Sequence, residues 1–433
     1  MYPATHWSSI ACPHGCAMPA DRCNVLFYPR RKTAPLKAGE LRLLPGLKGS
    51  VFTYFPDYVA HPEAIALDPF GLPLRREERV TMKDDARLLP EAIGDAGPDA
   101  WGRKVIDRVA KLERSSEFDY LIAAGPNRIG ALDFSLSDDP APPAVAKLTD
   151  LADIEAAIDQ VKKRQPLDDR LRHLLAPGAS LGGVRPKTAV EAQGKLWIAK
   201  FNAREEDFDA VSMEYAGMRL AQKAGLAVAQ VRKHQFSDRR TALLVLRFDR
   251  EPLGGGAFGR LPYLSARSLL CGYGREVLGE AKPRYSYPLL AEARRLTGSS
   301  AVLSEDLKEL FRRMVFNILV DNTDDHESNH GFVHDDGWRL SQAFDISPQM
   351  TRLGYQQLQV GTGDTESSLT NALSACERFG LRRDEAVAVV ERLIEASKDM
   401  ADIYRDAGIE PARIEAAEQY RRRLVREFGK PEL

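Results

Sequence analysis

The chain has 433 residues, of which 44% are hydrophobic and 28% are charged, a composition typical of folded globular proteins and not of disordered ones. Its 61 Lys and Arg residues nearly balance its 62 Asp and Glu residues, so the net charge of −1 argues against direct binding to nucleic acid or to an anionic membrane. The length predicts two or three domains, and since we find no apolar run of about 18 residues and no signal-peptide pattern, we expect a cytoplasmic protein with no membrane partner.

Cysteines cluster near the N-terminus, where Cys12, Cys16 and Cys23 have the spacing C-x3-C-x6-C. This spacing is not a common zinc-ligand pattern, and whether these residues bind a metal stays open. The total of five cysteines is odd, which does not suggest a disulfide framework and fits a reducing compartment. We interpret residues 1–23 as an N-terminal extension.

Residues 24–140 mix short β-like pieces, "NVLFY" and "SVFTYF", with a helical stretch at "AWGRKVIDRVAKL". This mixture predicts a small α+β domain. The segment "SDDPAPPAVAKLTD" (residues 137–150) is rich in proline and polar residues, so we place a domain boundary there.

From residue 151 the pattern predicts a helix over 151–164, strands over 188–192 and 196–201 with the turn "QGK" between them, and a long helix over 208–225. After Phe311 the chain is expected to be mainly helical.

The most polar stretch is "DNTDDHESNHGF", residues 321–332, which follows the apolar run "MVFNILV". Asp324 and Asn329 give the spacing D-x-x-x-x-N found in the catalytic loop of protein kinases. In that loop the Asp accepts the proton of the substrate hydroxyl, and the Asn holds a magnesium ion. A polar loop that only caps the preceding helix is the alternative.

A further carboxylate follows in "WRLSQAFDISP", which we read as a short strand that ends at Phe344 and Asp345. An Asp at such a strand end can supply a second magnesium ligand, because Mg²⁺ prefers oxygen ligands. The alternative is that Asp345 is a turn residue or a helix N-cap before Ser347 and Pro348.

Upstream, the strand "LWIAKF" carries Lys200, whose charge is hard to explain as core packing. Kinases use such a lysine on the phosphates and a glutamate of the next helix to hold it, which here is Glu214. A solvent position for Glu214 is the alternative. Before this strand, "ASLGGVRPKTAV" combines Gly182 and Gly183 with Lys187 and is a candidate phosphate loop, although it matches neither the Walker nor the kinase glycine pattern.

Together these segments resemble the HipA-type serine/threonine kinases, the toxins of bacterial toxin–antitoxin modules. "DAGPDAWGRKVIDR" and "RIGALDFS" resemble the N-terminal HipA domain, "SLGGVRPKTAV" the phosphate loop, "LVLRFDR" the adenine-contacting segment and "NTDDHESNHGF" the catalytic loop. The resemblance covers nearly the whole chain. It implies an α+β fold: a small N-terminal α+β domain, then a protein-kinase-like (HipA-type) fold with an N-lobe-like region at 151–250 and a mainly helical C-lobe at 251–433.

The resemblance implies that Asp324 is the proton acceptor, that Lys200 contacts the phosphates, and that Asn329 and Asp345 hold Mg²⁺. Ser180 aligns with a serine whose autophosphorylation ejects the loop and switches the kinase off. The nucleotide-binding residues that we expect are Gly182, Gly183, Val184, Arg185, Pro186, Lys187, Lys200, Glu214, Leu246, Arg247, Phe248, His326, Asn329, Phe344 and Asp345. The family's loop often reads "AGAQEK" where this chain has "GGVRPK", so Arg185 and Pro186 change the local charge and stiffness of the loop.

The implied function is that of an ATP- and Mg²⁺-dependent serine/threonine protein kinase that phosphorylates a cytosolic protein, with an aminoacyl-tRNA synthetase as the leading candidate. Its expected partner is a HipB-like helix-turn-helix antitoxin, and operator DNA would be bound through the antitoxin complex. The basic segment "YRRRLVREFGK" is expected to be a solvated helix face. A pseudokinase or binding module and a small-molecule kinase of related fold remain alternatives, and the sequence does not indicate the oligomeric state.

Overall fold

The computed structural model describes residues 20–83, 88–110, 116–137, 145–163, 165, 174–175, 184–202, 209–236, 240–280, 283–298 and 300–429. The chain forms two compact units, one made of residues 1–201 and 249–264 and the other of residues 202–248 and 265–433. The segment boundaries that we drew from the sequence stay predictions.

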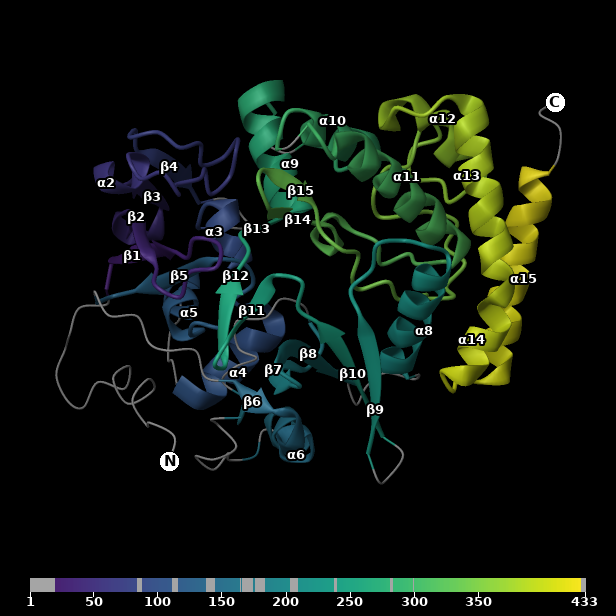
Figure 1. Cartoon of the computed structure of the whole chain (residues 1–433), viewed down its shortest axis with the longest axis horizontal. Helices are drawn as coiled ribbons and strands as arrows, with labels where there is room; N and C mark the ends of the chain where they lie inside the picture. Colours follow the sequence, from purple (N-terminus) through teal and green to yellow (C-terminus); the bar gives the residue numbers. More distant parts are fainter. Residues whose placement is uncertain are drawn as a thin grey trace. The chain divides into compact units, whose positions relative to one another are not determined.

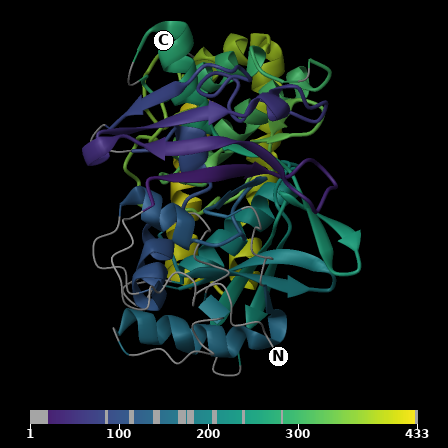
Figure 2. The same cartoon turned by 90° about the vertical axis from the view of Figure 1, so that its left-hand side faces the viewer.

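The first unit contains an antiparallel five-stranded sheet with the strand order β4-β3-β2-β1-β5. Its strands are β1 (Arg22–Phe27), β2 (Leu36–Leu43), β3 (Gly49–Tyr54), β4 (Arg79–Met82) and β5 (Leu132–Ser135). In Figure 2, β1, β2 and β3 lie side by side as the purple strands. Aromatic and β-branched residues favour strands, and here Val25, Phe27, Phe52 and Tyr54 are buried in the core of this unit.

Short helices accompany this sheet: α2 (Pro56–Val59), α3 (Glu91–Asp95), α4 (Ala100–Ala110) and α5 (Glu117–Ala123). The fully buried Arg128 donates to the Asp133 carboxylate at 3.0 Å and to the carbonyl oxygens of Ala96 and Leu121 at 3.1 and 2.7 Å. A buried guanidinium is tolerated only with such a set of acceptors. Arg128 therefore connects α3 and α5 to the sheet. The presence of this sheet with its helices confirms the α+β character expected for this part of the chain.

A hairpin of β11 (Arg250–Gly254) and β12 (Ala257–Arg260) joins the same unit from far along the chain. The Asp249 carboxylate accepts a hydrogen bond from the backbone of Gly130 at 2.8 Å, and Arg250 donates to the Gly130 carbonyl at 2.9 Å. The motifs "RIGALDFS" and "LVLRFDR" thus meet at one buried turn.

The rest of the first unit contains α6 (Leu151–Lys162), the short β6 (Ala146–Lys147), and a hairpin of β7 (Lys187–Ala192) and β8 (Lys195–Phe201). Gln193 and Gly194 form its turn with φ of 54° and 67°, as tight hairpin turns require. The predicted helix, turn and two strands are confirmed here, with bounds that differ by one or two residues.

The second unit is mainly helical (Figure 1). It comprises α8 (Ala210–Lys223), β9 (Val231–Gln235), β10 (Thr241–Leu246), α9 (Ala266–Tyr273), α10 (Tyr287–Arg295), α11 (Leu303–Leu319), β14 (Gly331–His334), β15 (Trp338–Leu340), α12 (Leu369–Ser374), α13 (Arg383–Ala396), α14 (Met400–Asp406) and α15 (Pro411–Phe428). Phe311, Met314 and Phe316 of α11 are fully buried, so this helix runs through the core. The predicted helical character after Phe311 is confirmed.

One expectation from the sequence is wrong, and two of the alternatives considered there are excluded. The strand that we expected to end at Phe344 and Asp345 ends at Leu340, and beyond it Ala343 forms an isolated parallel bridge with Val228. The helix-cap alternative for Asp345 fails as well, because residues 346–350 are irregular. The solvent alternative for Glu214 also fails, since its exposure is 1%.

In the part of the chain that is described, no helix is both long and apolar enough to cross a membrane. Cys23 is buried in β1, and no group of three or more His, Cys, Asp or Glu residues suited to a metal ion is found among the described residues. Cys12 and Cys16 lie outside them.

Candidate functional site

The polar stretch after α11 forms a loop that turns sharply away from the helix. Asp321 has a φ of 55°, which interrupts the helical path directly after Val320. Along the loop the side chains of Asn322, Thr323 and Asp325 are buried, whereas Asp324 is exposed. The two adjacent aspartates therefore differ in role: Asp325 faces the protein and Asp324 faces the solvent.

The D-x-x-x-x-N spacing closes this loop on itself. The Asn329 side-chain amide donates to the carbonyl oxygen of Asp324 at 2.8 Å, and the backbone N–H of Asn329 donates to the His326 carbonyl at 2.9 Å. His326 accepts the backbone N–H of Ser328 on its Nδ1 at 3.2 Å. Because the nitrogen of the Asn329 amide is bound to the loop, its oxygen is the atom that can act as a ligand.

Asn329 and Asp345 line one small pocket, together with His330 and Phe344. Asp345 has a φ of 59°, a left-handed conformation that Asp tolerates better than most residues and that is often found at functional sites. An amide oxygen and a carboxylate in one pocket are the hard oxygen donors that Mg²⁺ prefers. The residues present therefore fit a magnesium ion.

Helix α8 packs closely against the backbone that follows Asp345. A Cβ atom at Gly217 would lie 2.4 Å from the carbonyl oxygen of Ile346 and 2.7 Å from Cδ of Pro348. Only glycine permits this approach. Glu214 lies one turn earlier on the same helix and is buried.

Gly217→Ala is expected to lower the free energy of unfolding by about 1–3 kcal/mol, the usual effect of an extra methyl group in a packed core. It should also weaken Mg²⁺-dependent nucleotide binding, because the displaced backbone carries Asp345. Denaturant unfolding and nucleotide titration measure the two effects. Gly429→Ala is the control, since its Cβ would meet its nearest atom at an ordinary 3.6 Å. Equal behaviour of the two variants would contradict the prediction.

Two lysines of the first unit face the same side of one hairpin. Lys187 of β7 and Lys200 of β8 are directly paired in the antiparallel register, and their exposures are 4% and 8%. Directly paired residues project from the same face, and two like charges there are unfavourable unless anions balance them. The contact of these lysines with phosphate groups stays a prediction.

Helix α4 supports the first of these lysines. The Trp101 indole donates to the Lys187 carbonyl at 3.1 Å, and Asp99 accepts the backbone N–H groups of Trp101 and Gly102. Burial raises the pKa of Asp99 to about 6, against the opposing effect of the Lys187 charge. The segment "GPDAWGR" therefore supports the start of β7, a link that the sequence did not suggest.

The rest of the candidate phosphate loop is only partly described. Val184 is exposed, Arg185 is half-buried, and the Pro186 carbonyl accepts the backbone N–H of Phe201 at 2.9 Å. Ser180, Gly182 and Gly183 lie outside the described residues, so their roles stay predictions.

The predicted adenine segment follows β10. The backbone N–H of Leu246 donates to the Gln230 carbonyl at 2.8 Å, so only its carbonyl oxygen is suited to contact a nucleotide. Arg247 is buried, and the Phe248 ring lies 5.6 Å from the Phe344 ring. Phe344 lines the pocket of Asn329 and Asp345. The second unit therefore connects the predicted adenine segment to the predicted metal site.

Lys187 and Lys200 belong to the first unit, whereas Glu214 and the loop residues belong to the second. The pairing of Lys200 with Glu214 accordingly stays a prediction. Sequence reasoning missed the buried residues that hold the loop, above all Arg313, Asn317 and Asp325. The signal for Asn317 was a polar residue inside the apolar run "MVFNILV".

Residues 179–401 match the model of the HipA-like C-terminal domain, and residues 33–135 match that of the HipA N-terminal domain. The chain belongs to the HipA family. The two matches follow the order of the HipA-like segments quoted above.

The fold is similar to a chain of the toxin–antitoxin complex of Shewanella oneidensis MR-1 that contains HipA, HipB and operator DNA. The TM-score is 0.65 at 17% identity, over 93% of this chain and 96% of that chain. This likeness confirms the HipA-type α+β fold. The proinflammatory kinase CtkA of Helicobacter pylori matches 53% of this chain and 94% of its own, with a TM-score of 0.36 at 15% identity, too low to support an argument. No curated protein matches the sequence.

Proposed function

We propose that this HipA-family protein is an ATP- and Mg²⁺-dependent kinase that phosphorylates a serine or threonine hydroxyl of a protein. The observation that carries the proposal is the shared pocket of Asn329 and Asp345, at the end of a loop that exposes Asp324. Phosphoryl transfer depends on positioning and charge neutralisation more than on covalent catalysis.

Each residue then has a role that its environment suits. Asp324 orients the acceptor hydroxyl and takes its proton, for which its exposed position is required. Lys187 and Lys200 bind the phosphates, and the Leu246 carbonyl contacts the adenine. Asn329 and Asp345 would hold Mg²⁺, which would offset the charge of the phosphate oxygens.

The remaining predicted contacts complete the proposed nucleotide site. His326 would lie at the edge of the nucleotide, and Glu214 would orient Lys200. Phe248 and Phe344 supply aromatic surface to the base, in keeping with the contact between their rings.

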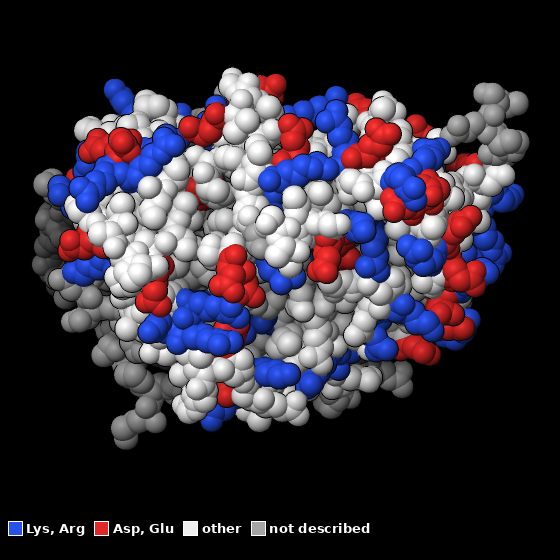
Figure 3. Space-filling view, turned by 45° about the horizontal axis from the view of Figure 1, so that its top comes forward, with Lys and Arg blue, Asp and Glu red and all other residues white. Residues whose placement is uncertain are grey.

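The family supports a role as the toxin of a toxin–antitoxin module, with a helix-turn-helix antitoxin as partner and a cytosolic substrate such as an aminoacyl-tRNA synthetase. DNA contact through the antitoxin agrees with the net charge of −1. On the face shown in Figure 3, basic and acidic side chains are interspersed. In α15, Arg421 and Arg422 both pair with Glu418 at 3.1 Å, so these arginines are engaged within their own helix.

Labelled ATP, Mg²⁺ and a lysate of the host test the proposal, with Asp324→Ala as the inactive control. One labelled host protein is expected beside the band of the autophosphorylated kinase itself, and both bands should be lost with the control. Label in a small molecule would indicate a small-molecule kinase. Nucleotide binding without any transfer would indicate a pseudokinase, and either result would overturn the proposal.

Ser180 is proposed as an inhibitory autophosphorylation site. A phosphate adds about −1.5 to −2 charges, which would compete with ATP for the loop amides and Lys200 and so expel the loop. Mass spectrometry should find phosphate on Ser180 in the wild-type protein and not in Asp324→Ala expressed alone. Phosphate on Ser180 in the variant would point to another kinase, and its absence from both proteins would remove the autoinhibition.

A further inference from the structure

One row of α11 carries three polar residues, two of them buried among the apolar side chains of the helix. Glu309, Arg313 and Asn317 are spaced four residues apart and therefore lie in one row along the helix. Arg313 and Asn317 are 2% and 3% exposed. Burying a guanidinium and an amide is unfavourable unless both are fully hydrogen-bonded, so the partners of this row are informative.

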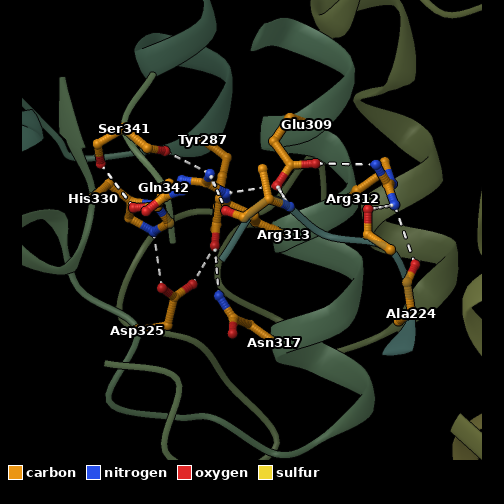
Figure 4. Close-up of polar contacts among 12 residues, drawn as sticks. Ala224, Tyr287, Glu309, Arg312, Arg313, Asn317, Asp325, His330, Ser341 and Gln342 are labelled. Atoms are coloured by element: carbon orange, nitrogen blue, oxygen red, sulfur yellow. Dashed lines mark hydrogen bonds and ion pairs between the residues drawn. The ribbon is translucent and has the colours of Figure 1, made fainter. Parts of the chain in front are cut away.

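Arg313 binds the backbone that leads to Asp345. Its guanidinium pairs with Glu309 at 3.1 Å and donates to the carbonyl oxygen of Ser341 at 2.7 Å (Figure 4). It also donates to the carbonyl oxygen of Ala227 at 3.2 Å. The same Ala227 carbonyl accepts the backbone N–H of Ala343 at 2.7 Å. Arg313 thus binds both segments that form the parallel bridge of Val228 and Ala343, which lies two residues before Asp345.

Asn317, one turn further on, binds the loop that exposes Asp324. Its amide donates to the Tyr287 hydroxyl at 3.2 Å, and Tyr287 in turn donates to one oxygen of the Asp325 carboxylate (Figure 4). The His330 Nε2 contacts the other oxygen at 2.9 Å, and Asn322 donates to the Asn317 side-chain oxygen at 3.1 Å. Asp325 is therefore anchored on both oxygens.

The direction of this chain of hydrogen bonds follows from burial. Burial, reinforced by the nearby Asp325 carboxylate, raises the pKa of Tyr287 well above its usual range, so the hydroxyl keeps its proton and acts as the donor. Asp325 then acts as the acceptor that holds the backbone one residue beyond Asp324. Because the network is buried, the loss of one member leaves a polar atom of its direct partner without that hydrogen bond.

We propose that Arg313 and Asn317 are positioning residues, through which one face of α11 sets the separation between the loop of Asp324 and Asn329 and the segment of Asp345. Asn317 acts on the loop through Tyr287 and Asp325, and Arg313 acts on the Asp345 segment through main-chain carbonyl oxygens. The catalytic consequence rests on the proposed kinase function, whereas the anchoring itself does not.

Tyr287→Phe tests the hydrogen bonds by which Asn317 holds the loop, and Tyr404→Phe is its matched control. Both tyrosines are 0% exposed, but the Tyr404 hydroxyl has no hydrogen-bond partner within the described chain. Tyr287→Phe should lower kcat by about 10-fold to 100-fold, the scale of a small misplacement of reacting groups, with Mg²⁺–nucleotide affinity unchanged within about twofold. In the protein without nucleotide, amide hydrogen exchange of residues 322–330 should quicken. Tyr404→Phe should match the wild type in kcat, in Mg²⁺–nucleotide affinity and in the exchange of residues 322–330.

Arg313→Lys tests the contacts of Arg313 with the Asp345 segment. Lysine keeps the charge but lacks the planar guanidinium, in which Nε reaches Glu309 while a second nitrogen reaches the two carbonyl oxygens. Mg²⁺-dependent nucleotide binding should weaken about 10-fold or more, as for other residues that orient metal ligands. Hydrogen exchange of residues 341–346 should quicken, with that of residues 322–330 unchanged. Arg405→Lys, in an exposed pair with Asp402, is the control.

The proposal requires that Tyr287→Phe quickens exchange in residues 322–330 and that Arg313→Lys quickens it in residues 341–346. Equal disturbance of both segments by each variant would show general destabilisation and overturn the proposal, as would no disturbance. If Tyr287→Phe does not fold, Asp325→Asn replaces it with the same expected effects on kcat and on exchange. If the wild type transfers no phosphate but each variant still quickens exchange only in its own segment, the kinase function is rejected and the anchoring by α11 is retained. If the wild type is active and both variants match it in transfer, nucleotide affinity and exchange, the positioning role of Arg313 and Asn317 is rejected.

Discussion

Asp324→Ala is expected to lower phosphoryl transfer by about 10²-fold to 10⁴-fold, the usual contribution of a positioned acid or base. The side chain is exposed at the tip of its loop, and the loop is closed by the Asn329 amide on the Asp324 carbonyl oxygen, which the substitution leaves in place. The fold and nucleotide binding should therefore be retained. Single-turnover transfer from labelled ATP and calorimetric nucleotide binding measure the two properties.

The control for this substitution is Asp402→Ala, another exposed aspartate of the same unit, paired with Arg405 on α14. It should transfer phosphate like the wild type. Asp325→Ala gives a second comparison, because loss of the buried carboxylate should lower both stability and activity. Retained transfer by Asp324→Ala would refute its assignment as the proton acceptor.

Asp345→Asn is expected to weaken Mg²⁺-dependent nucleotide binding by at least about tenfold, because a charged oxygen ligand of the cation is replaced by a neutral one. Asparagine is the informative replacement, since Asp345 has a φ of 59° and Asn tolerates the left-handed region where Ala is strained. Nucleotide titrations with Mg²⁺ and with a chelator measure the effect. With the chelator, the variant should bind as weakly as the wild type.

Asp336→Asn is the matched control, because Asp336 also has a positive φ of 53° but lies exposed in the turn between β14 and β15. Asp336→Asn should bind Mg²⁺–nucleotide with the affinity of the wild type. If Asp345→Asn bound Mg²⁺–nucleotide as well as Asp336→Asn does, Asp345 would be a turn residue and not a metal ligand.

The order of the parts could be predicted from the sequence because it depends on local signals. Hydrophobic periodicity predicted the hairpin of β7 and β8 and the long helix α8, and the residues from Asp324 to Asn329 predicted a polar loop after α11. The strand end before Asp345 could not be predicted, since Ala343 pairs with Val228, more than a hundred residues earlier in the chain. Alternation within one segment carries no information about such a partner.

The sequence by itself determined which chemical groups are available and in what order: the two lysines, the glutamate of α8, the D-x-x-x-x-N loop and the later aspartate. Only the tertiary structure decided their environment. It buries Asp325 and exposes its neighbour Asp324, buries Glu214, and brings Asn329 and Asp345 to one pocket. The physical reason is that burial and long-range hydrogen bonds depend on packing between distant segments, here on α11, whose Arg313 and Asn317 reach the two loops that the sequence shows only as separate polar stretches.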